Sequence, residues 1–279
     1  MDNLPTLTEV VRQHHLYANK TLGQHFLLDM NITDKIARLA TPFDGATVFE
    51  VGPGPGGLTR SLFKAGANKV IAIEMDDRFL PPLAEIGEAA DGELRVINGD
   101  ALKVDMAAEA SGEIKIAANL PYNVGTKMLT NWLTAEPIFW SRAVLMFQKE
   151  VAERVVASVG DSGYGRLAIL AQSVCEVDYA FTVPASAFSP PPKVDSAVVV
   201  LNVLPASERY PHLKLLGDIT KAAFGQRRKM LRKSLKTIAK KYDLDAGDWC
   251  EACGVSAMQR PEELTPQQFQ VMADYVVDR

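Results

Sequence analysis

Residues 119–122 combine an amide, a backbone carbonyl, a proline and an aromatic ring, in the order Asn119, Leu120, Pro121 and Tyr122. The exocyclic amine of a nucleobase is a weak nucleophile, because its lone pair is delocalised into the ring. The Asn119 side-chain oxygen and the Leu120 carbonyl oxygen can accept its two N–H bonds, since Pro121 stiffens the turn and has no N–H. Tyr122 can stack on the base. The alternative is a strand-to-helix connector, in which Asn119 caps a helix and Tyr122 packs.

A glycine-rich turn closes an apolar stretch at residues 49–59, which read FEVGPGPGGLT. Glycines such as Gly52 and Gly54 permit a positive φ and let a ligand approach the backbone closely. Glu74 follows Gly52 after 74 − 52 = 22 residues, a spacing at which an acidic side chain can bind ribose hydroxyls. This pair fits a nicotinamide dinucleotide as well as S-adenosylmethionine.

Asp100 distinguishes the two cofactors. It follows the third apolar stretch, where its carboxylate can accept a hydrogen bond from an adenine amino group while Leu102 covers the ring. A dinucleotide fold needs no acid there, and Asp100 alone would also fit a turn cap. With Gly52, Glu74 and Asp100 at three successive strand ends, the pattern favours S-adenosylmethionine.

Short apolar runs and amphipathic stretches alternate from residue 47 onwards, which is typical of a parallel sheet with crossover helices. We expect strands at residues 47–52, 69–73, 94–97, 114–119, 143–148, 177–183 and 196–203. We expect helices at residues 31–40, 57–66, 78–89, 125–134, 148–159 and 164–175. Only a loop at 184–195 separates the last two strands, so we predict an antiparallel end to the sheet.

The pattern changes at residues 204–211 (LPASERYP), which indicate a linker. Beyond it we expect only helices, at residues 213–224, 227–242, 245–253 and 265–278. We therefore predict an α/β cofactor-binding domain at 1–205, with an N-terminal arm at 1–30, and a small all-α domain at 206–279.

The charge of the chain is unevenly distributed. The formal net charge is −4, yet residues 221–241 carry nine Lys and Arg and no acidic residue. A single-sign run of this kind favours contact with RNA or DNA, whereas a solvated helix surface is the alternative. The residues expected to contact nucleic acid are Arg227, Arg228, Lys229 and Arg232.

The composition also indicates the compartment in which the protein acts. We find no leader-like start and no apolar run long enough for a membrane span, so we expect a cytoplasmic protein without membrane contact. The three cysteines agree with a reducing compartment. Cys250 and Cys253 have zinc-like spacing but lack a second Cys or His pair, so we expect no metal. No exposed apolar stripe is evident, and we expect a monomer.

Seven motifs follow the order found in the ribosomal RNA adenine dimethyltransferases. They are residues 19–29 (NKTLGQHFLLD), 50–54 (EVGPG), 73–76 (IEMD), 99–101 (GDA), 119–123 (NLPYN), 148–151 (QKEV) and 188–196 (FSPPPKVDS). Residues 223–232 (AFGQRRKMLR) extend the likeness towards the C-terminus. The chain thus resembles this family, and specifically its bacterial small-subunit group, over most of its length.

The resemblance implies a class I S-adenosylmethionine-dependent methyltransferase domain, which is Rossmann-like, followed by a helical RNA-binding domain. It implies transfer of two methyl groups to each of two adjacent adenosines near the 3′ end of 16S rRNA. The substrate would be the small ribosomal subunit or its precursor, late in assembly. The target base must be splayed out to reach such a pocket.

The resemblance also implies roles for individual residues. His25, which stands where the family has Asn, and Leu27 would contact the methionine end of the cofactor, and Ala101 and Asn119 would belong to the cofactor site. Phe188 would cover the second face of the target base, with a core position as the alternative.

Three other functions remain possible at this point. A nicotinamide oxidoreductase explains the glycines and Glu74 but gives residues 119–122 and Asp100 no role. A non-catalytic ribosome assembly factor would not need these residues intact. A large-subunit rRNA methyltransferase of the antibiotic-resistance type shares the fold, but such enzymes usually have a smaller helical domain.

Overall fold

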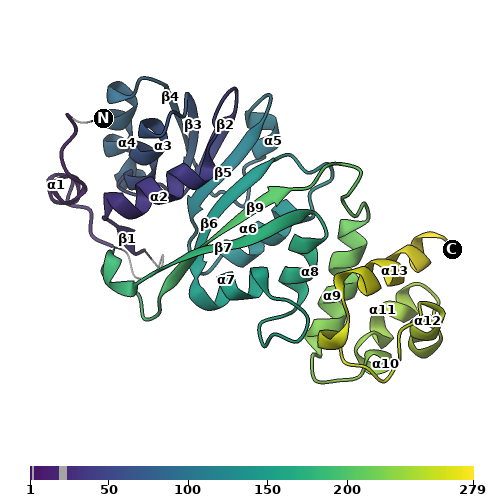
Figure 1. The fold of residues 1–279 in the computed structure, drawn as a ribbon. Coiled ribbons are helices and arrows are strands. Elements are labelled where there is room, and N and C mark those ends of the chain that lie inside the picture. The colour runs from purple at the N-terminus through teal and green to yellow at the C-terminus, as the bar shows by residue number, and fades with distance from the viewer. Residues whose placement is uncertain (2, 19–23) are drawn as a thin grey trace. The chain divides into compact units, whose positions relative to one another are not determined.

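The computed structural model describes residues 1, 3–18 and 24–279 (Figure 1). The chain forms two compact units. Unit 1 comprises Met1–Met128, Phe139–Ala152 and Asp178–Asn202, and unit 2 comprises Leu129–Ile138, Glu153–Val177 and Val203–Arg279. Unit 2 therefore gathers earlier segments together with the C-terminal helices. The predicted domain boundary at 205/206, defined by cofactor and RNA binding, stays a prediction.

A mixed sheet forms the centre of unit 1 and has the order β4-β3-β2-β5-β6-β9-β7 in the described part of the chain. Its strands are β2 (Thr47–Val51), β3 (Lys69–Glu74), β4 (Glu93–Asn98), β5 (Ile114–Asn119), β6 (Arg142–Gln148), β7 (Cys175–Val183) and β9 (Ser196–Val203). All lie within two residues of a predicted strand. The pairs from β4 to β6 are parallel and β9 runs antiparallel to β6, which confirms the predicted change of direction.

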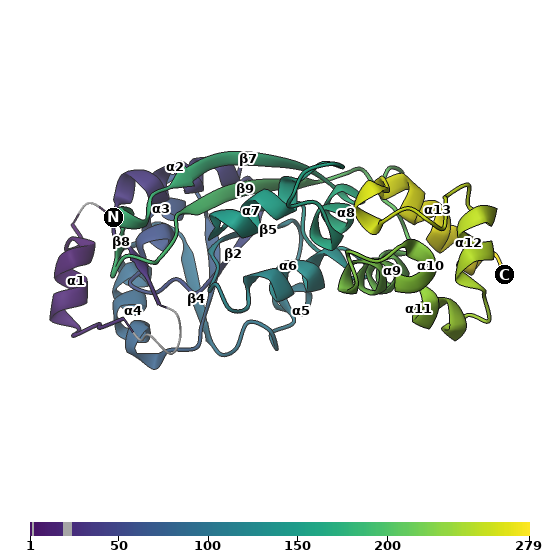
Figure 2. The ribbon, with the colours of Figure 1, turned by 90° about the horizontal axis from the view of Figure 1, so that it is seen from below.

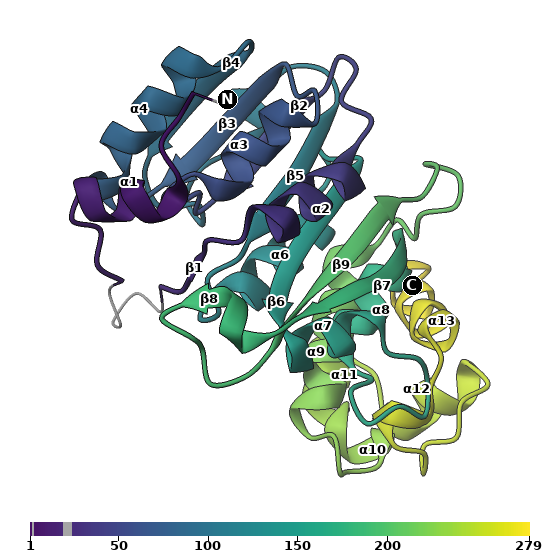
Figure 3. The same cartoon turned by 60° about the vertical axis from the view of Figure 1, so that its left-hand side comes forward.

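Helices cover both faces of this sheet, with α2 and α5 on opposite sides (Figure 2) and α2 beside α3 (Figure 3). The helices that begin before residue 150 are α1 (Leu7–Gln13), α2 (Met30–Ala40), α3 (Gly57–Lys64), α4 (Leu80–Ala89), α5 (Met106–Glu109), α6 (Gly125–Leu133) and α7 (Lys149–Val156). All five residues of β2 are buried, as is typical of a parallel strand covered on both faces. By contrast, β4 at the edge of the sheet has no fully buried residue.

Four short helices and strands of unit 1 were not predicted, namely α1, α5, β1 (Phe26–Leu27) and β8 (Phe188–Ser189). Strand β1 pairs antiparallel with β8, and two-residue strands carry no periodic signal. Helix α1 has a capping box between Thr6 and Glu9, a T-x-x-E pattern that sequence reasoning could have found. The start of the 19–29 motif, at residues 19–23, lies outside the described residues.

Unit 2 is helical apart from the ends of β7 and β9, and it includes the C-terminal parts of α6 and α7. Its helices are α8 (Arg166–Gln172), α9 (Leu213–Gly225), α10 (Leu231–Ser234), α11 (Lys236–Lys241), α12 (Ala246–Ala252) and α13 (Pro266–Val277). Trp249 and Phe269 are fully buried among them. Within the described ranges every helix is too short or too polar to cross a bilayer.

The prediction of one helix over residues 227–242 is wrong, because the chain turns at 226–230 and then forms α10 and α11. The Leu231 N–H donates to the Gln259 carbonyl oxygen at 2.8 Å, and the Arg232 N–H donates to that of Ala257 at 3.1 Å. These tertiary hydrogen bonds replace the i−4 bonds that a continuous helix would make at these positions.

Candidate active site

A cavity of about 280 Å³ opens in unit 1 at the carboxyl ends of β2, β3, β4 and β5. Ligands of open α/β sheets bind at this edge. The lining residues are Gln24, His25, Phe26, Val51, Gly52, Gly54, Ile73, Glu74, Met75, Phe79, Gly99, Asp100, Ala101, Leu102, Asn119, Leu120, Pro121, Tyr122, Asn123, Val124 and Met128. The cavity thus brings together the predicted strand-end residues, from Gly52 to Tyr122.

The turn after β2 exposes backbone to the cavity. Gly52 has φ 65° and Gly54 has φ 54°, both in the left-handed region that favours glycine. The Gly52 N–H donates to the Ile73 carbonyl oxygen at 2.9 Å, which fixes the turn against β3. A side chain at either glycine would be strained and would stand between a ligand and the backbone.

Glu74 is a buried carboxylate, 5% exposed, in the wall of the cavity. Its two oxygens accept the backbone N–H groups of Gly54, at 3.2 Å, and Asp76, at 2.9 Å. Burial raises the pKa of Glu74 above its ordinary value. Among the residues that the structure describes, no cationic side chain forms an ion pair with Glu74, so its remaining lone pairs are available to ligand hydroxyls.

Asp100 lies in the same wall, at the turn after β4. Its Oδ1 accepts the Leu102 N–H at 2.9 Å, so the predicted turn-capping contact is present. Only one carboxylate oxygen is used, and within the described chain Oδ2 keeps its capacity to accept a hydrogen bond from a ligand.

Asn119 ends β5, and the turn that follows holds two open acceptors. The Leu120 N–H donates to the Met146 carbonyl oxygen at 3.2 Å. In the described part of the chain, neither the Asn119 side chain nor the Leu120 carbonyl oxygen has a hydrogen-bond partner. The start of α6 is held instead by the Pro121 carbonyl, which accepts the N–H groups of Val124 and Gly125. Asn119 therefore does not cap α6, which removes the connector explanation for its amide.

Tyr122 is fixed at the rim of these acceptors. Its hydroxyl hydrogen-bonds the Ser196 hydroxyl at 2.7 Å, and burial raises the pKa of Tyr122. The His25 ring lies 5.8 Å from the Tyr122 ring, centroid to centroid, at an interplanar angle of 28°. His25 Nδ1 lies 2.8 Å from the Pro190 carbonyl oxygen, so His25 connects the Tyr122 ring with the segment that follows β8.

Two predicted site residues lie elsewhere. Leu27 and Phe188 are register partners in the β1–β8 pair, and both are buried in the hydrophobic core formed with α2 and α3. Neither lines the cavity. The structure therefore supports the core alternative for Phe188 and a core position for Leu27, because the short pairing turns both side chains into the apolar interior.

The comparisons with known proteins agree with one another. A family model described as Ribosomal RNA adenine dimethylase matches residues 15–276. The chain belongs to this family. It is 52% identical to Ribosomal RNA small subunit methyltransferase A of Maricaulis maris over 275 residues, 98% of this chain and 95% of that protein. The protein of the same name from Agrobacterium fabrum is 50% identical over 279 residues, which cover 98% of each chain.

Solved structures give the same result. The crystal structure of a dimethyladenosine transferase from Plasmodium falciparum matches with a TM-score of 0.74 at 29% identity, covering 89% of this chain and 96% of that one. The 23S rRNA methyltransferase ErmE, at 24% identity and a TM-score of 0.64, shares the fold. The class I methyltransferase fold is confirmed.

As a member of the dimethylase family, the chain is an enzyme that takes methyl groups from S-adenosylmethionine. This excludes the nicotinamide oxidoreductase. The cavity fits the cofactor, since Glu74 offers buried acceptors for hydroxyls and Asp100 an open acceptor for an amine. The lining residues that sequence reasoning passed over include Gln24 and Met75; the position of Met75 directly after Glu74 was an available signal.

The basic segment lies in unit 2. Arg228, Lys229 and Arg232 are exposed. In contrast, Arg227 forms an ion pair with Glu262 and donates to the Ser162 carbonyl oxygen at 2.8 Å. Arg227 is thus engaged within unit 2, whereas the side chains of the other three extend into solvent.

Proposed function

We propose that this enzyme transfers two methyl groups to each of two adjacent adenosines near the 3′ end of 16S rRNA, in the small ribosomal subunit or its precursor. One observation carries the proposal: two acceptors that have no partner among the described residues, on Asn119 and Leu120, share a cavity with Glu74 and Asp100. The names of the bacterial relatives support the small subunit as the substrate. We further expect a monomer that acts in the cytoplasm.

The cofactor-binding role falls to residues of the first three strand ends. Glu74 would accept the ribose hydroxyls, Asp100 the adenine amine, and the backbone at Gly52, Gly54 and Ala101 would meet the ligand closely. His25 borders the same cavity. When bound, S-adenosylmethionine supplies an electrophilic methyl group, so no metal or strong general base is required.

Residues 119–122 would position the target amine and stabilise the charge that develops on it. The Asn119 amide oxygen and the Leu120 carbonyl oxygen would hold the target amine by its N–H groups and set the direction of its lone pair. Positive charge develops on that nitrogen during transfer, and both oxygens stabilise it more than they stabilise the neutral amine. Pro121 keeps the turn rigid.

Tyr122 would stack on the extruded base. Its hydrogen bond to Ser196 and its contact with His25 support a fixed ring plane. The family motif implies Phe188 for the second face, and its buried position would require β8 to shift when RNA binds.

RNA binding would use exposed cations of unit 2, among them Arg228, Lys229 and Arg232. Phosphate contacts from such residues supply most of the sequence-independent affinity for nucleic acid. The ion pair of Arg227 argues against an equal share for that residue.

Reconstitution with purified, unmethylated small subunits tests the proposal. We expect two dimethyladenosines per 16S rRNA, detected by nucleoside mass spectrometry and located by primer extension. Unmethylated large subunits serve as the matched control substrate and should remain unmodified. Methylation of the large subunit alone would favour the antibiotic-resistance type, and methylation of neither would favour an assembly factor that acts without catalysis.

A further inference from the structure

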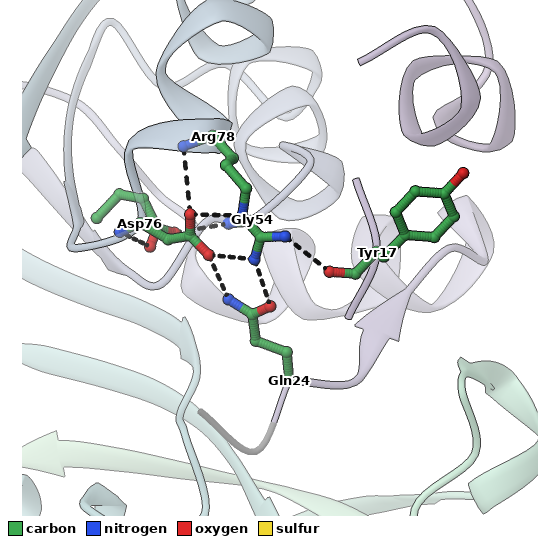
Figure 4. Close-up of polar contacts among 6 residues, drawn as sticks. Tyr17, Gln24, Gly54, Asp76 and Arg78 are labelled. Carbon is green, nitrogen blue, oxygen red and sulfur yellow. Dashed lines mark hydrogen bonds and ion pairs between the residues drawn. The ribbon is translucent and has the colours of Figure 1, made fainter. Parts of the chain in front are cut away.

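A polar cluster borders the cofactor cavity and has no part in the roles above. We call Tyr17, Gln24, Asp76 and Arg78 the Asp76 cluster (Figure 4). Gln24 lines the cavity, whereas Asp76 and Arg78 follow β3 and Tyr17 precedes β1 in the chain. The cluster therefore joins the N-terminal segment to the strand end that carries Glu74.

Arg78 binds Asp76 with two parallel hydrogen bonds. Nε lies 2.9 Å from Oδ1 and Nη2 lies 2.6 Å from Oδ2, the fork geometry in which guanidinium and carboxylate match best. The Arg78 hydrogen bond is the largest cause that lowers the pKa of Asp76 to about 2. The pair is therefore charged throughout the working pH range.

The same guanidinium also holds the N-terminal segment. Nη1 donates to the Tyr17 carbonyl oxygen at 3.0 Å, and Nη2 donates to Gln24 Oε1 at 3.3 Å. The Gln24 amide nitrogen donates to Asp76 Oδ2 at 2.9 Å. Both the oxygen and the nitrogen of the Gln24 amide are therefore hydrogen-bonded, and the position of Gln24 in the cavity wall depends on the Asp76–Arg78 ion pair.

Asp76 also contacts Glu74, the carboxylate that we propose binds the ribose hydroxyls. Its backbone N–H donates to Glu74 Oε1 at 2.9 Å. Its negative charge close to Glu74 would disfavour the ionised form of Glu74, and Arg78 offsets that charge. The Arg78 side chain is 42% exposed and that of Asp76 only 9% exposed, so the guanidinium reaches Asp76 from the solvent side.

We propose that Arg78 is a positioning residue for the cofactor: it holds Gln24 in the cavity wall and fixes the Tyr17 backbone carbonyl. The inference rests on the proposed role of Glu74 and adds a residue that does not itself line the cavity. The Arg78 guanidinium thus connects the three other residues of the Asp76 cluster.

Calorimetric titration with S-adenosylmethionine and steady-state kinetics test the inference. Arg78→Ala should raise both Kd and KM for the cofactor about tenfold, because Gln24 is then no longer held in the cavity wall, while kcat stays within about twofold. Arg95→Ala is the matched control. Arg95 is 40% exposed and forms an ion pair with Glu109 at 2.7 Å, and neither residue lines the cavity. The Arg95→Ala variant should bind the cofactor as the wild type does.

A double-mutant cycle supplies the readout that a merely structural role would not move. Gln24→Ala alone should weaken S-adenosylmethionine binding. In the Arg78→Ala background the same substitution should add little, because Gln24 is no longer held there. Arg78→Lys, which keeps the charge but not the fork, should bind with intermediate affinity and covers the case in which Arg78→Ala fails to fold.

Three results would overturn the inference: Arg78→Ala binding like Arg95→Ala, strictly additive effects of the two substitutions, or full affinity in Arg78→Lys. Glu74→Gln distinguishes the two levels of the account. If Glu74→Gln binds normally, the proposed ribose role fails; if only Arg78→Ala binds normally, the positioning role fails and the ribose role stands.

Discussion

Glu74 combines burial with two backbone donors and an open face towards the cavity, which makes its charge state important for binding. We predict that Glu74→Gln weakens S-adenosylmethionine binding by roughly 1.5–3 kcal/mol, about ten- to a hundredfold, because a charged acceptor is removed. In the wild type, affinity should fall as pH falls through the raised pKa of Glu74, since protonation removes the acceptor. Calorimetric titrations at a series of pH values should show this loss of affinity at low pH in the wild type and not in the Glu74→Gln variant. Equal affinities at neutral pH would contradict the ribose assignment.

Glu50, also in unit 1, is a buried carboxyl on β2. It accepts the Thr59 hydroxyl at 2.6 Å, and burial, with a smaller contribution from Glu74, raises its pKa to about 8. The folded state therefore binds the proton more tightly than the unfolded chain does, so stability is highest below pH 4.5 and is lost as pH rises towards 8.

We predict that Glu50→Gln removes this dependence. Between about pH 5 and 8, the wild type should lose more than about 1 kcal/mol of unfolding free energy relative to the Gln variant. Urea unfolding of both proteins at a series of pH values measures the difference. Parallel curves would mean that Glu50 ionises in the folded state without cost.

At the scale of elements, the main strands could be predicted because each is an apolar run bounded by turn residues. Their carboxyl ends meet at one edge, so Gly52, Glu74, Asp100 and Asn119 could be placed together from sequence. The β1–β8 pair could not be predicted, since two residues have no period, and for that reason the core positions of Leu27 and Phe188 stayed hidden. The break at residues 226–230 arises from tertiary backbone hydrogen bonds, which override helix propensity.

The same break predicts unequal roles for the basic residues. Reversing Arg228, Lys229 and Arg232 to Glu should weaken rRNA binding and reduce the salt-dependence slope by roughly 0.7–0.9 for each phosphate that is no longer neutralised. Filter binding at several salt concentrations, with cofactor affinity as the control, measures this. Arg227→Ala is the companion variant: it should lower the melting temperature, because its ion pair is removed, and leave the slope close to that of the wild type. An unchanged slope in the triple variant would show that the segment is a solvated surface.

At the scale of the whole molecule, a net charge of −4 coexists with a basic segment in unit 2 and an acidic cofactor wall in unit 1. The overall charge therefore says little about the partner, and its distribution says more. Dimethylation adds a further requirement. After one transfer the amine keeps a single N–H, so only one of the two acceptors remains engaged and the pocket must tolerate the first methyl group.

We therefore expect monomethyladenosine to appear only as a transient. A time course of nucleoside mass spectrometry on unmethylated small subunits should show it rise and then fall as dimethyladenosine accumulates. Monomethyladenosine as the stable end product of the wild-type enzyme would instead indicate a monomethylase.

The central claim is that Asn119 acts chiefly on the target amine, with little effect on the fold or on cofactor affinity. The most direct measurement compares Asn119→Ala with the wild type for methyl transfer to small subunits and, by calorimetry, for S-adenosylmethionine binding. The account predicts a loss of turnover by about two orders of magnitude or more, with cofactor affinity within a few fold. Normal turnover in Asn119→Ala would contradict it.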